Sequence, residues 1–275
     1  MPKSFLFALL FFFAGWLATT AMLPGITAMI SKANYLKANY KGELIPCGLG
    51  VVLYLSVIAI FSVSLPVLPK EMYFEIVVFL FTFSAYTLLG LMDDFWGSGD
   101  CRGLSGHLRY LLRGEVTTGL LKASVGGAMA VIIAATLGKW TLIPLNALII
   151  ALSVNLINLL DLRPGRAGKS YLLLTFLLVA AFPDREEIFF TMVVAGSVVA
   201  YLPIDLKAKA MMGDAGANAL GSALGISAVW FLSLEMKGLY LVLLGLLHLL
   251  TEKYSLTGII SNNKVLDYID RLGRK

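Results

Sequence analysis

Two adjacent carboxylates, Asp93 and Asp94, end a long apolar stretch of the sequence. Acidic residues at the ends of such stretches are rare unless they face water or a cation, which makes them candidates for function. No basic residue lies near the pair in sequence, so the two charges repel each other unless a cation binds to them. The alternative interpretation is a solvated helix end, because an acidic pair alone does not define a chemistry.

A third acid, Asp214, lies between Gly213 and Gly216 at the start of another apolar stretch. The glycines allow a tight turn with exposed backbone amides, and a carboxylate or a bound phosphate is stabilised near a helix N-terminus. Asp214 can also serve as the N-cap of the helix that follows. The two roles are compatible, so Asp214 is a candidate functional residue.

Three polar side chains, Asn155, Asn158 and Asp161, recur at i, i+3 and i+6 in an otherwise apolar stretch. This spacing places them on one stripe of a helix. Oxygen ligands suit a hard cation such as Mg²⁺, which binds through one or two protein groups together with substrate phosphates. Interhelical hydrogen bonding by the asparagines is the alternative.

The loop that follows this stripe carries Arg163, Arg166 and Lys169. Its Gly-Lys-Ser ending imitates a nucleotide-binding P-loop, but that motif requires Gly where this chain has Arg163, and a preceding strand. A nucleotide-hydrolysing P-loop is therefore rejected. The three cations suit pyrophosphate binding, and ordinary loop charge on the cytoplasmic side explains them equally well.

Membrane helices must position these residues, because the 275 residues are 59% hydrophobic and only 14% charged. A soluble domain is about 45–50% apolar and about 25% charged. Stretches that could cross the hydrocarbon core occur nine times, at 5–30, 44–68, 72–92, 118–138, 141–160, 170–183, 188–204, 215–234 and 238–251. We expect an all-α, polytopic membrane helix bundle of about nine to ten transmembrane helices, forming one domain over residues 1–275 without an extramembrane module.

The basic residues predict the orientation. Sorting them by alternate loops places 17 of the 22 Lys and Arg residues on one side, and the cytoplasmic side is the enriched one. The N-terminus is therefore expected outside and the C-terminus in the cytoplasm, with the candidate acids at cytoplasmic helix ends. A cleaved signal peptide over residues 1–21 is the alternative, and it would put the lysines of 31–43 outside.

The net charge of +5 does not indicate a nucleic-acid partner, because it is spread over loops instead of forming a basic face with interleaved aromatics. The two cysteines, Cys47 and Cys101, are too few for a zinc cage of cysteines, and their positions do not favour a disulfide. Residues 262–274 have apolar positions at helical spacing, which predicts a short amphipathic helix at the membrane interface.

Taken together and in this order, the motifs resemble those of the polyprenyl-phosphate N-acetylhexosamine-1-phosphate transferases. Residues 41–50 resemble the family's Pro-x-Gly-Gly segment, with Leu49 in place of one glycine. The other matches are Asp93-Asp94, the loop segment 103–107 with His107 where many members have Lys, the Asn155, Asn158 and Asp161 motif, and the Met-Gly-Asp-x-Gly segment at 212–216.

The resemblance implies that a polyprenyl phosphate attacks the sugar-linked phosphate of a UDP-aminosugar, most simply UDP-GlcNAc, and releases UMP at the cytoplasmic face of the cell membrane. It implies Mg²⁺, or alternatively Mn²⁺, held by Asp214 and Asn158. Asp93 would be a general base or would organise the lipid phosphate, with Asp94 beside it and Asp161 completing the catalytic set. Substrate contacts fall to Lys41, His107, Asn155, Arg163 and Arg166, and a homodimer is common in the family.

The chain departs from the family at several positions. Many members continue the Asp161 motif as Asp-Gly-x-Asp-Gly, where this chain has Leu162 and Pro164, and the His-rich cytoplasmic motif of well-known members is missing. Four alternatives therefore stay open: transfer of phospho-MurNAc-pentapeptide, a divergent inactive homologue, an intramembrane prenyltransferase, and a transporter or lipid-binding protein. The acids favour an enzyme, because a transporter would hold them near the bilayer midplane.

Overall fold

The computed structural model of the chain describes residues 3–97 and 118–274, so the predictions for His107 and Cys101 lie outside the described residues. The elements, in chain order, are α1 (Lys3–Lys32), β1 (Leu36–Ala38), β2 (Leu44–Pro46), α2 (Val51–Ser64), η1 (Leu65–Val67), η2 (Lys70–Met72), α3 (Tyr73–Trp96), α5 (Thr118–Thr136), η3 (Trp140–Leu142), α6 (Ile143–Leu160), α7 (Arg166–Ala181), α8 (Ile188–Leu206), α9 (Gly213–Phe231), α10 (Leu234–Lys253), α11 (Leu256–Asn262) and α12 (Lys264–Arg271).

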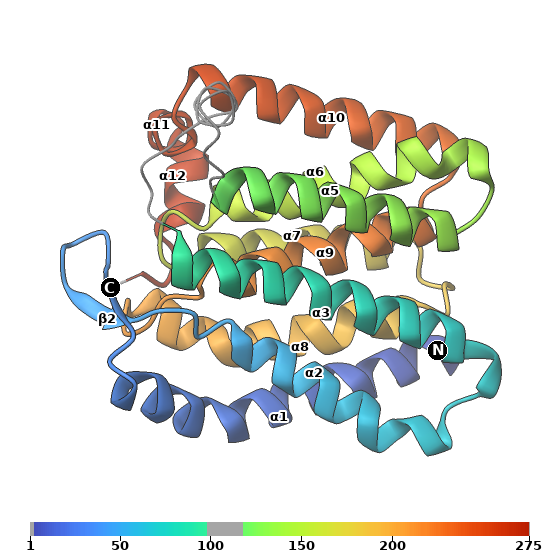
Figure 1. Cartoon of the computed structure of the whole chain (residues 1–275), viewed down its shortest axis with the longest axis horizontal. Helices are drawn as coiled ribbons and strands as arrows, with labels where there is room; N and C mark the ends of the chain where they lie inside the picture. The colour runs from blue at the N-terminus through green and yellow to red at the C-terminus, as the bar shows by residue number, and fades with distance from the viewer. Residues whose placement is uncertain (1–2, 98–117, 275) are drawn as a thin grey trace.

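Within the described residues, nine helices, α1–α3 and α5–α10, run along one axis of the bundle (Figure 1). Each of them overlaps one of the nine predicted apolar stretches. Six of them, α1, α3, α5, α6, α8 and α10, are long and apolar enough to cross a membrane by themselves. The chain begins at one end of the bundle and finishes at the other (Figure 1). The prediction of an all-α polytopic membrane bundle is therefore confirmed.

The helix α9 lies in the interior of the bundle, where it contacts other helices instead of lipid, and it is richer in small residues than the long apolar helices at the periphery. It packs between α3 and α6, and nearly all of its Gly, Ala and Ser residues are buried. Small residues let helix backbones approach closely in a membrane protein. A Cβ atom at Gly90 of α3 would lie only 2.2 Å from the carbonyl oxygen of Asp214, so the N-terminal turn of α9 is pressed against α3.

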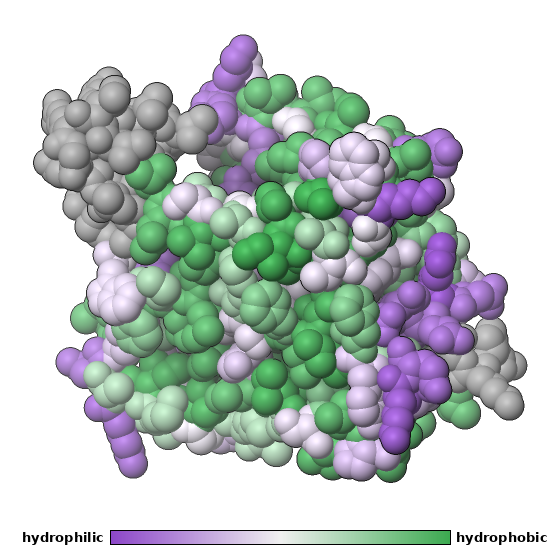
Figure 2. Space-filling view, turned by 45° about the vertical axis from the view of Figure 1, so that its right-hand side comes forward, coloured by the Kyte–Doolittle hydropathy of each residue, from purple (hydrophilic) through white to green (hydrophobic). Residues whose placement is uncertain are grey.

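Apolar side chains cover the outside of the peripheral helices. Leu6 and Leu10 of α1 and Leu239, Val242 and Leu246 of α10 are each more than half exposed. Figure 2 shows apolar side chains over the middle of one face and hydrophilic ones toward its edges. This distribution is that of a protein whose outer surface is solvated by lipid.

The predicted span 44–68 is wrong at its start. Leu44–Pro46 forms the strand β2, which pairs antiparallel with β1 in the register Leu36↔Pro46. The helix begins only at Val51 because the preceding backbone is used elsewhere: the Pro46 carbonyl accepts a hydrogen bond from the Met211 N–H, and the Gly50 N–H donates to Met212. The hairpin is thereby tied to the segment just before α9.

The chain ends in two short helices, α11 and α12, at the same end of the bundle as the hairpin (Figure 1). The amphipathic helix predicted within 262–274 is therefore confirmed as α12. Its exposed residues include Val265 and Tyr268, whereas Asp270 is buried against the bundle.

Candidate active site

The end of α3 and the start of α9 are joined through Asp94. The two oxygens of its carboxylate accept hydrogen bonds from the backbone N–H groups of Asp214 and Ala215, each at 3.0 Å. A carboxylate in this position satisfies donors that a helix N-terminus leaves unpaired. Gly213 has φ +72°, and a Cβ there would lie 2.6 Å from the Asp94 carboxylate. The glycine before Asp214 is therefore required by both the backbone conformation and the space.

The hairpin holds the same residue from the other side. The Tyr35 hydroxyl and the Lys37 ammonium both donate to the backbone carbonyl of Asp94. Sequence reasoning counted Lys37 only as a loop charge. Together these contacts make Asp94 a buried junction between α3, α9 and the hairpin.

A lysine from α5 lies between the other acids. The Lys122 ammonium is 2.5 Å from a carboxylate oxygen of Asp214 and 3.3 Å from one of Asp93. Sequence reasoning missed this residue, because it counted Lys122 only as orientation charge. Its position in the sequence could have identified it, because Lys122 lies a few residues inside an apolar stretch, where a charge needs a partner.

Asn158 completes the arrangement from α6. With its amide oriented to satisfy the hydrogen-bond network, its nitrogen donates to Asp214 at 2.9 Å and its oxygen accepts from Lys122 at 3.2 Å. Oxygens from Asp93, Asp214 and Asn158 therefore surround one ammonium group. These residues come from three different helices, α3, α9 and α6.

Asp161 extends the acidic cluster at the C-terminal end of α6, where its own N–H caps the helix. Burial raises the pKa of its carboxyl well above the ordinary value, and the neighbouring carboxylates of Asp205 and Asp214 raise it further. Asp205 of α8, which sequence reasoning did not single out, accepts a hydrogen bond from the Gly165 N–H at 2.9 Å. Gly165 has φ +75°, so this bond fixes the sharp turn between α6 and α7.

The donor set fits a hard divalent cation, because its ligand atoms are oxygens. They already converge on one positively charged group, and the acids around them outnumber the single lysine. Among the described residues no group of three or more His, Cys, Asp and Glu side chains could hold a metal alone. A metal here would use two carboxylates, the Asn158 amide oxygen, water and the oxygens of a bound phosphate.

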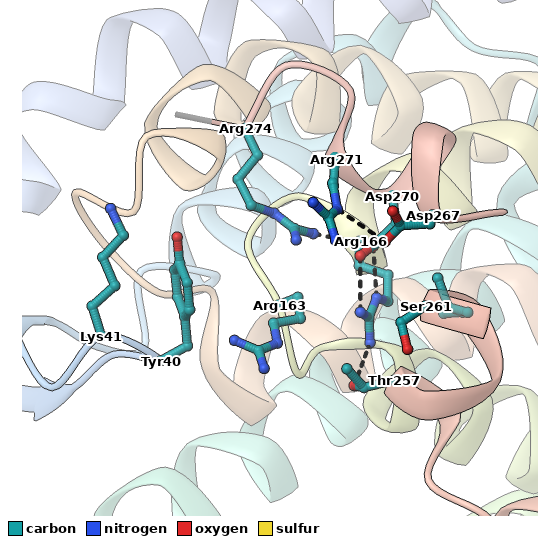
Figure 3. A pocket seen from close by; sticks show the side chains of 11 residues that line it. Tyr40, Lys41, Arg163, Arg166, Thr257, Ser261, Asp267, Asp270, Arg271 and Arg274 are labelled. Carbon is teal, nitrogen blue, oxygen red and sulfur yellow. Dashed lines mark hydrogen bonds and ion pairs between the residues drawn. The ribbon is translucent and has the colours of Figure 1, made fainter. Parts of the chain in front are cut away.

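The remaining predicted contacts lie apart from this cluster. Asn155 is on the exposed side of α6. Lys41 and Arg163 line a cavity of about 500 Å³ at the end of the bundle (Figure 3). Arg166 also borders this cavity, but its side chain is only 4% exposed and forms a two-pronged ion pair with Asp270 of α12, at 2.7 and 3.0 Å. Sequence reasoning could not foresee that pairing, because the two residues are far apart in the chain.

Cys47 lies in the turn between β2 and α2 and is buried. Burial raises the pKa of its thiol to about 12, and the Asp94 carboxylate raises it further. The thiolate is the reactive form of cysteine, so burial and the raised pKa both disfavour Cys47 as a nucleophile.

The model of glycosyl transferase family 4 matches residues 76–232. This match covers more than half of the chain and contains the acidic cluster, Lys122 and the whole of α9. The chain belongs to glycosyl transferase family 4. It is a membrane transferase whose substrates are a polyprenyl phosphate and a nucleotide sugar, and it transfers a sugar phosphate to the lipid. No curated protein matches the chain.

Proposed function

We propose that the chain transfers an aminosugar 1-phosphate, most simply GlcNAc-1-phosphate, from a UDP-sugar to a polyprenyl phosphate at the cytoplasmic face of the cell membrane. A phosphate oxygen of the lipid forms a bond to the sugar-linked phosphorus, the bond from that phosphorus to UMP breaks, and UMP leaves as an anion. The product is a polyprenyl-diphospho-sugar, an intermediate for envelope glycans.

The observation that carries the proposal is the ring of oxygens from Asp93, Asp214 and Asn158 around one cation position. Two phosphorylated substrates repel each other at low dielectric unless positive charge lies between them. Phosphoryl transfer depends mainly on positioning and on electrostatic stabilisation. Mg²⁺, or Mn²⁺ in its place, would act there as a template and charge clamp, held by Asp214 and Asn158.

The residues of the cluster have separate roles in this proposal. Asp93 orients the lipid phosphate or accepts its last proton, and Lys122 neutralises the phosphate charge beside it. Asp94 is a positioning residue, because its carboxylate is fully used by the N-terminus of α9. Asp161 completes the catalytic set, and a cation bound in the cluster would favour its ionised form.

The donor's phosphates and sugar are assigned to Lys41, His107, Asn155, Arg163 and Arg166, as the resemblance to the family implies. The resemblance to the family also supports a homodimer. Size measurement of the detergent-solubilised protein decides its oligomeric state.

The function is tested by measuring UMP release in detergent with undecaprenyl phosphate and Mg²⁺. UDP-GlcNAc and UDP-MurNAc-pentapeptide are compared as donors. Release of UMP from UDP-GlcNAc alone supports the proposal. Release only from UDP-MurNAc-pentapeptide means that the transferred sugar is phospho-MurNAc-pentapeptide instead. The absence of release from both contradicts a transferase that uses these donors.

A further inference from the structure

A polar cavity of about 500 Å³ lies at the end of the bundle, beside the turn that links Asp161 to α7. Three segments far apart in the sequence form its walls: the loop between β1 and β2, the turn between α6 and α7, and the C-terminal helices α11 and α12 (Figure 3). The first and third walls lie outside the region that matches the family, residues 76–232.

The walls carry an excess of positive charge. Five cationic and two acidic side chains line the cavity. Asp270 is shared by two guanidinium groups, those of Arg166 and Arg274, and Asp267 pairs with Arg271. Within the described residues, Lys41 and Arg163 have no carboxylate within ion-pair distance, so their charge is available to a ligand.

Lys41 and Arg163 are held in place without an acid. The Lys41 ammonium lies 5.6 Å from the centre of the Tyr40 ring, and the Arg163 guanidinium lies 5.1 Å from it. Both distances are within the range of cation–π attraction. Figure 3 shows Tyr40 between the two cations. The side chain of Arg274, from the C-terminal tail (α11, α12 and the residues after them), borders the same space.

Several hydrogen bonds and an ion pair hold the C-terminal tail against the bundle. The buried Arg166 guanidinium forms an ion pair with Asp270 and also donates a hydrogen bond to the Thr257 hydroxyl at 3.1 Å. The Lys169 ammonium donates to the backbone carbonyls of Ile269 and Asp270 at 2.8 and 2.6 Å. These contacts fix the end of α12, which carries Arg274 toward the cavity.

We propose that this cavity binds a phosphoanion, a phosphate ester or diphosphate, between Arg163 and Lys41 on one side and Arg274 of the C-terminal tail on the other. Guanidinium groups bind phosphate oxygens through strong, charge-assisted hydrogen bonds. The anion can be that of a soluble nucleotide or that of a lipid headgroup, since both present the same chemistry. The inference deepens the proposed function, on which its placement of the substrate phosphates rests, and it makes the tail part of the binding site.

The test is a calorimetric titration of the full-length protein in detergent with pyrophosphate and, separately, with UMP. A second arm measures binding of phosphatidic acid against phosphatidylcholine in nanodiscs. Arg163→Gln and Arg274→Gln should each weaken binding by about tenfold, the usual consequence of losing one charged hydrogen bond. The matched control is Lys264→Gln, which removes the same charge from an exposed position of α12 outside the cavity and should change the affinity by less than about twofold.

The outcomes separate cleanly. Loss of pyrophosphate or UMP binding in both variants supports a soluble ligand, and the same loss confined to phosphatidic acid supports a lipid headgroup. Binding that neither variant weakens, or that only Arg163→Gln weakens, overturns the proposal. Lys41→Gln provides a second variant of the same wall if Arg163→Gln elutes as an aggregate. UMP release is measured on the same samples. If the protein releases UMP but the variants bind the anion as tightly as the wild type, only the cavity assignment is refuted. If the variants bind the anion more weakly but the wild type releases no UMP, only the proposed function is refuted.

Discussion

The Lys122 ammonium lies 2.5 Å from the Asp214 carboxylate, at the point where Asp93 and Asn158 also present oxygens. A lysine from α5 therefore occupies the position that a divalent cation would use. Under the proposed function the two cations would compete for the same ligands, so binding of the metal would displace Lys122 from Asp214.

Replacing Lys122 by Met should therefore strengthen divalent cation binding. A unit charge about 4 Å away is worth about 4 kcal/mol at an effective dielectric of about 20, so a gain of at least tenfold in affinity is expected. Electron paramagnetic resonance of added Mn²⁺ measures the affinity without any turnover. Unchanged or weaker Mn²⁺ binding would show that lysine and metal use different ligands.

Asp214→Asn should lower UMP release by more than about 100-fold, because even partners of metal ligands cost about 10- to 100-fold when they are lost. The matched control is Asp184→Asn, which makes the same change at an exposed site in the loop between α7 and α8. The measurement is the initial rate at saturating lipid acceptor. If the Asp214 variant keeps near-wild-type release, Asp214 is not a metal ligand.

Gly213→Ala should destabilise the protein by about 1–3 kcal/mol, since alanine is strained at φ +72° and its Cβ would meet the Asp94 carboxylate at 2.6 Å. Gly127→Ala in α5 is the control, because a Cβ there meets nothing within 4 Å. Thermal unfolding in detergent compares the two. Equal unfolding temperatures would mean that the turn before α9 adapts without cost.

The docking of the C-terminal tail should depend on pH through Asp270. Burial raises the pKa of Asp270, but hydrogen bonding and charge from Arg166 and Arg274 more than offset this, so its pKa lies below the ordinary value. A carboxyl with a depressed pKa stabilises the folded state fully above its unfolded pKa of about 3.9 and loses that contribution as the pH falls further. The tail should stay docked at neutral and mildly acidic pH and detach only below about pH 4.

Hydrogen exchange of α12 amides, corrected for intrinsic rates, measures this detachment. Asp270→Asn should expose α12 at every pH, because breaking a buried pair costs about 3–5 kcal/mol. Detachment of the wild-type tail already near pH 6 would mean that Asp270 does not control docking.

The helices and the acidic motifs were predictable from sequence because they depend on local patterns. The length of the apolar stretches predicted all nine helices, and the spacing of Asn158 and Asp161 predicted that they share one face of a helix. Lys122, Asp205 and the Arg166–Asp270 pair were not predictable in the same way. Each acquires its role from a contact with a distant segment, and a single sequence contains no direct record of such contacts.

The strand β2 was mistaken for the start of a helix for a related reason. Leu44–Pro46 is apolar enough to extend the following stretch, and composition alone does not separate a short strand from a helical turn. The deciding contacts are backbone hydrogen bonds to Tyr35, Met211 and Met212, which no side-chain pattern encodes.

The interior position of α9 has a consequence for how the protein responds to its lipid environment. A membrane helix in contact with lipid tilts when the bilayer thickens or thins. The helix α9 is enclosed by protein along nearly its whole length, whereas α1 and α10 carry the exposed apolar faces. We therefore expect the peripheral helices to absorb changes in bilayer thickness, and the depth of Asp214 relative to its neighbours on α3 and α6 to stay nearly constant.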